Sequence, residues 1–154
     1  ESAGATLAAA VSHAARNRVP RPLGQLLIYP QLGGRPGPSH RLHANAPLLT
    51  LHELEAYRGV RSGGSPPARD PTFEPLADDD FSSLPLTMVV TAECDPLASE
   101  GVSYCERVHA AGGAAVLRQE PRLTHSFLRA RASVPRARAA FERIVADALR
   151  LARS

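Results

Sequence analysis

Three polar side chains of the kinds used in nucleophilic catalysis lie along the 154-residue chain, namely Ser2, Asp95 and His125. A serine hydroxyl is a poor nucleophile until a base takes its proton, and imidazole can do this near neutral pH because its pKa is about 6.5. A carboxylate can fix the tautomer of the imidazole and stabilise its charged form. Together these residue types indicate acyl transfer through a serine.

The segment around Ser2 carries half of a pattern that presents a nucleophile. In G-x-S-x-G sequences a sharp strand-to-helix turn exposes the serine hydroxyl, and small neighbours let the backbone make that turn. Only the second half of this pattern is present, in Glu1-Ser2-Ala3-Gly4-Ala5. An ordinary helix N-cap explains the same residues, because serine is a favoured cap.

The two partner residues also have simpler explanations. An aspartate followed by Pro96 can cap a helix, and His125 can be an exposed loop residue. Cys94 is a rival nucleophile, but it lies beside Asp95 rather than on a turn like that of Ser2. A buried, inert thiol is the alternative for this cysteine.

Three short apolar segments predict the strands of a parallel sheet, at about 23–29, 86–92 and 114–119. The first is almost continuously apolar, as in a strand buried on both faces. The second is rich in branched residues, which favour strands. A short loop over 120–124 is expected to follow the third strand and to lead to His125.

Helical patterns alternate with these strands. They cover Ser2 to about Asn17, the segment from Pro96 to Gly112-Gly113, and the C-terminal segment that Ser133 is expected to cap. In the first helix the apolar stripe is Leu7, Ala10, Val11 and Ala14, and in the last it is Ala137, Ala140, Phe141, Ile144, Val145, Ala148 and Leu149, with Asp147 facing outward. This alternation predicts an α/β fold with crossover helices.

A long insertion over about 31–80 interrupts the alternation, and it is lid-like because glycine and proline crowd parts of it. Thr50 and Glu53 form a capping box for one short helix, to about Tyr57. His40, His43 and His52 could suggest a metal site, but no carboxylate or cysteine stands at ligand spacing among them, so we expect no metal. The acidic run 78–80 is expected to be a solvated turn.

The predicted topology brings the three polar residues together. In a parallel α/β sheet, active residues gather at the carboxyl ends of the strands. Asp95 and His125 follow the second and third strands, and Ser2 opens the first helix. Jointly these positions favour a catalytic triad over three unrelated residues.

Composition excludes several other classes of protein. The formal charge is +3 and the arginines are scattered among acids. The arginines at 129–138 could form a nucleic-acid patch, but no aromatic residues alternate with them, and a solvated helix face is expected instead. No apolar run approaches the roughly 18 residues of a membrane span. Two cysteines suit a reducing compartment, and we expect a cytoplasmic location.

The chain resembles the C-terminal half of the hormone-sensitive-lipase-like esterases, an α/β-hydrolase family with an H-G-G-G oxyanion motif. The resemblance covers essentially the whole chain. It rests on E-S-A-G at the start, L-L-I-Y-P at 26–30 and T-A-E-C-D-P-L at 91–97, with support from A-G-G at 111–113 and T-H-S-F at 124–127. The triad order of that family is serine, aspartate, histidine.

The resemblance implies a serine hydrolase of carboxylic esters, with a preference for short acyl chains and no cofactor. Ser2 would be the nucleophile, Asp95 the acid, His125 the base, and the backbone N–H of Ala3 an oxyanion donor. Residues 1–154 would then be the C-terminal part of one α/β-hydrolase domain, with the insertion over 31–80 shaping the substrate pocket and contacting a cap.

This sequence also departs from the family pattern. Ala5 stands where a further glycine is common, and Ser126 replaces the usual glycine after the histidine. The H-G-G-G motif is absent from the 154 residues, so we expect an incomplete fragment that is nearly inactive alone. Two alternatives remain: a non-catalytic ligand-binding module with the hydrolase fold, or an inactive truncated product.

Overall fold

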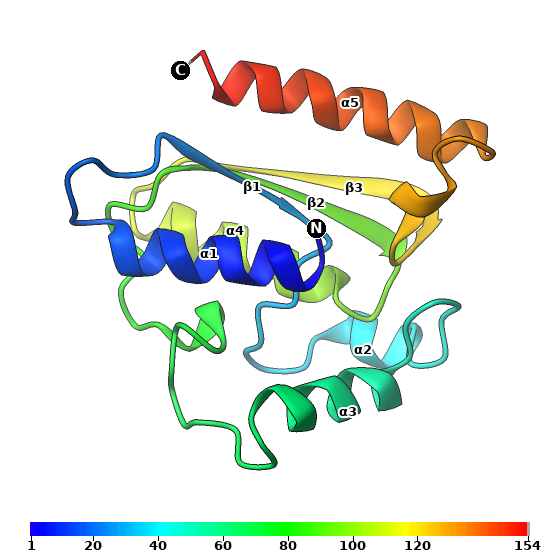
Figure 1. Cartoon of the computed structure of the whole chain (residues 1–154), viewed down its shortest axis with the longest axis horizontal. Coiled ribbons are helices and arrows are strands. Elements are labelled where there is room, and N and C mark those ends of the chain that lie inside the picture. Colours follow the sequence, from blue (N-terminus) through cyan, green and yellow to red (C-terminus); the bar gives the residue numbers. More distant parts are fainter. Residues whose placement is uncertain (154) are drawn as a thin grey trace.

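The computed structural model describes residues 1–153 and contains a three-stranded parallel sheet with helices on both faces (Figure 1). The strands are β1 (Gly24–Ile28), β2 (Leu86–Cys94) and β3 (Ala115–Thr124). Their spatial order is β1-β2-β3, and both neighbouring pairs are parallel. The predicted α/β class and its three strands are confirmed.

Five α-helices accompany the sheet in the described part of the chain. They are α1 (Ala3–Ala15), α2 (Pro38–Leu42), α3 (Leu51–Arg61), α4 (Ala98–Ala110) and α5 (Pro135–Leu151), with short 3-10 turns at Pro75–Ala77 and Phe127–Ala130. Helices α1 and α4 lie on one face of the sheet and α5 on the other, while α2 and α3 lie beyond the first layer (Figure 1). Within residues 1–153 no helix combines the length and apolar character needed to cross a bilayer.

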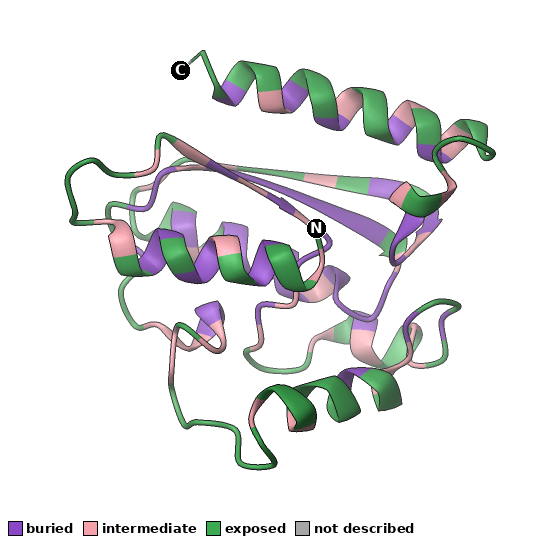
Figure 2. Cartoon of the chain, viewed as in Figure 1, coloured by how far each residue is buried: buried purple, intermediate pink, exposed green. Residues whose placement is uncertain are grey.

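Alternating side chains of the strands supply two cores. Leu27 and Val89 pack with α1 and α4, whereas Val90 packs with Ala140 and Ile144 of α5. The strand β2 is buried over most of its length because helices cover both of its faces (Figure 2). This strand therefore forms the rigid centre from which the residues after it project.

Glycine at position 101 lets α4 approach β2 closely. A Cβ atom there would lie 2.5 Å from the Thr91 Cγ2 atom and 3.0 Å from the Val89 Cγ1 atom. Real Cβ contacts do not come so close, so this helix can pack at its present depth only with glycine at this position.

The exposed and buried faces of α1 differ from the prediction. Leu7 and Val11 are 65% and 59% exposed. Ala10 is buried as predicted, but the rest of the buried stripe contains Ala5, Ala9 and His13. Alanine at most positions gives little contrast between faces, so periodicity could not fix which side turns inward. The small alanines then allow the helix to lie close to the sheet.

The third strand and the last helix also differ from the prediction. The predicted loop over 120–124 is wrong, because β3 continues to Thr124 after a register shift opposite Ala92 to Cys94. Pro121 is tolerated since β3 has only one described neighbour and needs no donor on its other side. Val134, not Ser133, is the N-cap of α5.

The predicted faces of α5 are wrong at Asp147, which is buried, and at Phe141, Val145 and Leu149, which are exposed. The acidic turn at 78–80 is also less solvated than expected. Asp147 is 1% exposed and accepts a hydrogen bond from Arg118 on β3 at 2.6 Å, a partner that helical periodicity could not reveal. Asp78 pairs with His13 and Arg16 of α1. The capping box of Thr50 and Glu53 is confirmed, although α3 extends to Arg61.

Candidate active site

Ser2 stands on a strained turn at the start of α1. Its backbone has φ 50° and ψ −123°, an unfavourable conformation for a residue with a side chain. The Ser2 N–H donates to the Ile28 carbonyl at the end of β1, at 2.9 Å, which holds the turn against the sheet. Its hydroxyl makes no capping hydrogen bond and lies 2.9 Å from His125 Nε2. The geometry therefore favours a presented hydroxyl over an ordinary cap.

A fully buried carboxylate lies behind the histidine. Asp95 directly follows β2 and is 0% exposed. One of its oxygens accepts the N–H of Leu97 at 2.9 Å, and the other lies 2.7 Å from His125 Nδ1. Because a carboxylate only accepts, Nδ1 carries the imidazole proton and Nε2 is left to accept from Ser2. Ser2, His125 and Asp95 thus form one hydrogen-bonded chain at the carboxyl edge of the sheet.

The imidazole is held by packing as well as by hydrogen bonds. His125 is 4% exposed, and the ring of Tyr29 meets it edge to face with centroids 4.8 Å apart. Tyr29 follows β1 and also packs on Phe127. Sequence reasoning missed this tyrosine, although its place at the end of the L-L-I-Y-P strand was a usable signal.

Ser126 adopts the left-handed region, with φ 58°. This conformation favours glycine, which agrees with the family resemblance placing glycine after the histidine. The chain turns here out of β3 and into the short 3-10 turn that begins at Phe127. Ser126 therefore keeps the turn that directs His125 toward Ser2, at some cost in backbone strain.

A pocket of about 470 Å³ opens above the serine and histidine. This size suits a small organic ligand. The insertion contributes the apolar part of its wall that contains Leu48, Leu49, Leu54, Tyr57 and Val60. Gln31, Leu97 and Arg129 complete other sides.

Ala3 also lines this pocket, beside Ser2. It is the first residue of α1, and the N–H groups in the first turn of a helix have no acceptor within that helix. Its backbone is therefore placed to donate to an anionic oxygen formed next to the serine.

A second histidine–aspartate pair lies elsewhere, on the α1 and α4 face. His13 contacts Asp78 at 2.7 Å and Tyr104 at 2.9 Å. Tyr104 is 0% exposed, and burial raises the pKa of its hydroxyl, which disfavours a phenolate nucleophile. Burial lowers the pKa of His13, although the hydrogen bond that His13 donates to Asp78 acts in the opposite direction. This cluster joins elements of the core and does not line the pocket beside Ser2 and His125.

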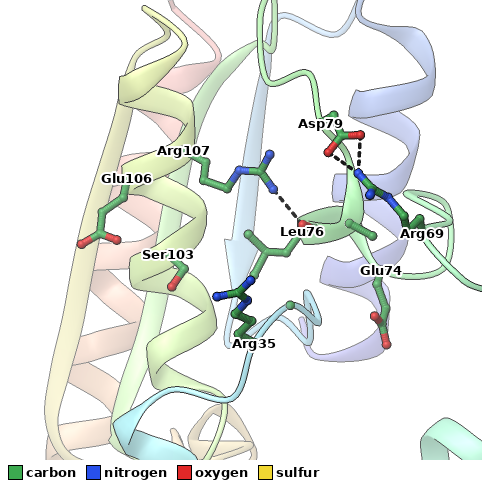
Figure 3. Close-up of a pocket in the computed structure, with 10 residues that line it drawn as sticks. Arg35, Arg69, Glu74, Leu76, Asp79, Ser103, Glu106 and Arg107 are labelled. Carbon is green, nitrogen blue, oxygen red and sulfur yellow. Dashed lines mark hydrogen bonds and ion pairs between the residues drawn. The ribbon is translucent and has the colours of Figure 1, made fainter.

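Another cavity, of about 710 Å³, lies between α4 and the segment around Leu76 (Figure 3). Its wall contains as many carboxylates as arginines. Arg69 is paired with Asp79 at 2.6 Å, and Arg107 donates to the Leu76 carbonyl at 2.8 Å. No histidine lines this cavity to activate its one serine, Ser103, so its residues do not support nucleophilic chemistry.

The histidines of the insertion have protein partners or lie apart. His40 contacts Glu100 at 3.2 Å. Among residues 1–153 no group of three or more histidine, cysteine or acidic side chains is arranged to hold a metal ion. Cys94 is half-buried and Cys105 is buried, and both are free thiols.

Comparison with known proteins shows the family and the fold of the chain. A family model described as the alpha/beta hydrolase fold matches residues 1–129. The carboxylic ester hydrolase LipN of Mycobacterium tuberculosis is 35% identical over 83% of the chain, and an ethyl acetate hydrolase of Pseudomonas putida is 31% identical over 84%. The crystal structure of EstE1, a thermostable carboxylesterase cloned from a metagenomic library, superposes with a TM-score of 0.82 over 96% of the chain at 32% identity.

The chain spans about half the length of these proteins, or less. It covers 36% of LipN, 42% of the ethyl acetate hydrolase and 51% of EstE1.

Proposed function

The chain belongs to the hormone-sensitive-lipase-like family of α/β-hydrolases, and from this premise we propose that the whole protein hydrolyses carboxylic esters through Ser2, His125 and Asp95. One observation carries the proposal. The serine hydroxyl, both imidazole nitrogens and a buried carboxylate form a continuous chain with links of 2.9 and 2.7 Å. The relatives named as ester hydrolases support the choice of ester as the substrate class.

In the acylation step Ser2 Oγ attacks the acyl carbon while its proton passes to His125 Nε2. The bond from the acyl carbon to the alcohol oxygen then breaks, and His125 returns the proton to that oxygen. A water molecule attacks the acyl-serine in the same way, its proton passes through Nε2 to Ser2 Oγ, and the carboxylic acid leaves. Asp95 keeps Nδ1 protonated and stabilises the imidazolium in both steps.

The backbone N–H of Ala3 would donate to the oxyanion that forms in each step. Removing a single oxyanion donor costs about 10²- to 10³-fold in rate in enzymes of this mechanism. The resemblance implies further donors from an H-G-G-G loop, a motif that the 154 residues do not contain. We therefore expect residues 1–154 alone to hydrolyse esters at least that much more slowly than the whole protein.

The shape of the pocket favours small esters. Its volume of about 470 Å³ is near the lower end of the range for ligand sites, and apolar residues of the insertion form much of its wall. A short acyl or alkyl group would bury its methylenes there at about 0.8 kcal/mol each. The insertion over 31–80 would thus shape the substrate pocket.

Hydrolysis of 4-nitrophenyl acetate and butyrate by the protein in its full natural length tests the proposal. We expect turnover that Ser2→Ala abolishes and that Ser103→Ala leaves unchanged, since Ser103 lies in the other cavity. The same assay on residues 1–154 alone should give little or no turnover. A full-length protein that folds but does not hydrolyse any ester would favour the non-catalytic binding module.

A further inference from the structure

Glu100 is a buried carboxylate that the triad mechanism does not use. It stands on α4, is 6% exposed, and receives the backbone N–H groups of Leu32 and Gly33 at 2.5 and 2.8 Å on one oxygen. Its other oxygen lies 3.2 Å from His40 Nε2. Burying a carboxylate is costly unless it is paired and hydrogen-bonded, and here three partners compensate the charge, which ties the turn at Leu32 and Gly33 and the helix α2 to this one residue.

The tautomer of His40 follows from its second contact. The Gly37 N–H donates to His40 Nδ1 at 3.1 Å, so that nitrogen must be unprotonated. The proton is therefore on Nε2, which donates it to Glu100. The carboxylate of Glu100 raises the pKa of His40, and the pair joins α2 of the insertion to α4.

A reciprocal pair of serines makes a second connection between the same helices. The Ser39 N–H donates to Ser99 Oγ at 3.0 Å, and the Ser99 N–H donates to Ser39 Oγ at 2.9 Å. Ser39 Oγ in turn donates to the Pro96 carbonyl at 2.6 Å, one residue after Asp95. We call Ser39, His40, Ser99 and Glu100 the α2–α4 cluster.

Hydrogen bonds link the α2–α4 cluster to residues next to the triad and to the segments that line the pocket. The Thr6 hydroxyl of α1 donates to the Gln31 carbonyl at 2.7 Å, and Gln31 is the pocket residue that directly precedes the two N–H groups bound by Glu100. On the far side of α2, the Leu51 N–H donates to the Ala44 carbonyl at 2.8 Å, which ties the start of α3 to the end of α2. Displacing α2 would therefore displace the wall that α3 provides.

We propose that Glu100 is a positioning residue that, through the α2–α4 cluster, sets the width of the ester pocket and so its selectivity for chain length. The inference rests on the proposed ester hydrolysis. Glu100 does not line the ester pocket, and its hydrogen bonds are to Leu32, Gly33 and His40 rather than to the triad. It holds the turn at Leu32 and Gly33 directly, and holds α2 and the following apolar wall through His40.

The substitution Glu100→Gln separates these two contacts. The amide oxygen of glutamine can still accept the N–H groups of Leu32 and Gly33, but its NH2 group then faces the Nε2–H of His40, so two donors oppose each other. Ser39→Ala releases the same helix by a different route, because it removes a hydroxyl and leaves Glu100 intact. Glu106→Gln is the matched control, an identical exchange at an exposed position of α4.

The experiment measures kcat and KM of the full natural protein on two ester series, 4-nitrophenyl esters of two to eight carbons and alkyl acetates of the same lengths. In the series where the wild type discriminates by chain length, the ratio of kcat/KM between the best and the worst length should fall about tenfold in both variants. This is roughly the contribution of one methylene contact. The loss should appear in KM, because the wall binds the ground state and the transition state alike. Labelling of Ser2 by a small fluorophosphonate should change by less than threefold.

Hydrogen exchange of the α3 backbone gives a second readout that does not need turnover. Both variants should exchange faster in α3 than the wild type and Glu106→Gln. Equal losses on all substrates with unchanged α3 exchange would overturn the inference, as would wild-type length selectivity in folded variants. A wild type that neither hydrolyses esters nor labels at Ser2 would contradict the proposed function, and this inference with it.

Discussion

Exchanging Asp95 for asparagine should disable the triad, although asparagine can still form hydrogen bonds with both Leu97 and His125. The carboxylate is 0% exposed and uses one oxygen for the Leu97 N–H and the other for His125 Nδ1–H. Asparagine can keep its oxygen on the Leu97 N–H only by turning its NH2 group toward His125. Nδ1 must then accept, the proton moves to Nε2, and the imidazole can no longer take the proton of Ser2.

The expected loss follows from this change of tautomer. In serine hydrolases the same exchange lowers kcat by about 10⁴-fold, which corresponds to about 5.4 kcal/mol in the activation barrier. The opposite orientation of the amide would place its NH2 against the Leu97 N–H in a fully buried site, where two opposed donors are costly. The wrong tautomer is therefore the lower-energy outcome.

Steady-state hydrolysis of 4-nitrophenyl butyrate by the full natural protein, with urea unfolding as a check on stability, measures this effect. Asp79→Asn is the matched control, because the side chain of Asp79 is 82% exposed and its exchange should leave kcat within twofold. A folded Asp95→Asn enzyme with kcat within tenfold of the wild type would refute the reasoning, since the tautomer would then not depend on this carboxylate.

Two further predictions concern the scaffold. Gly101→Ala should lower the free energy of unfolding by about 1–3 kcal/mol in a urea titration. The new Cβ atom would lie 2.5 Å from Thr91 Cγ2, so α4 would have to move. A change below about 0.5 kcal/mol would show that the helix moves without cost, against this prediction. Burial of the Asp78 carboxyl opposes its ionisation, but hydrogen bonds from the Asp80 N–H, His13 and Arg16 outweigh this and lower its pKa to about 2. The contribution of Asp78 to the free energy of unfolding is therefore complete above about pH 4 and is lost as the pH falls toward 2. The free energy of unfolding should then fall less steeply with decreasing pH in Asp78→Asn than in the wild type. Identical slopes for the two proteins would contradict this.

The positions of the site residues were predictable because strand patterns are strong here. Branched and apolar residues mark β1 and β2 clearly, and the parallel topology brings their carboxyl ends to one edge of the sheet. Asp95 and His125 could therefore be placed near Ser2 before any contact was known. The distances and the choice of Ser2 as a presented hydroxyl rather than a cap required the structure.

Other features depend on contacts between residues distant in sequence. Nothing local distinguishes Glu100 from the exposed Glu106 on the same helix, because its partners come from the turn after β1 and from α2, sixty or more residues earlier. The buried pair of Asp147 with Arg118 is of the same kind. In α1 the failure has another cause, since an alanine-rich helix has almost no hydrophobic contrast to orient it.

The most direct test of the central claim is the site of covalent labelling. The full natural protein treated with a fluorophosphonate and analysed by peptide mass spectrometry should carry one adduct per molecule on Ser2. The rate of labelling should fall sharply in His125→Ala, which removes the base, and in Asp95→Asn, which leaves the imidazole in a tautomer that cannot take the proton of Ser2. A folded protein that takes no adduct, or takes it on another residue such as Ser103, would contradict the account.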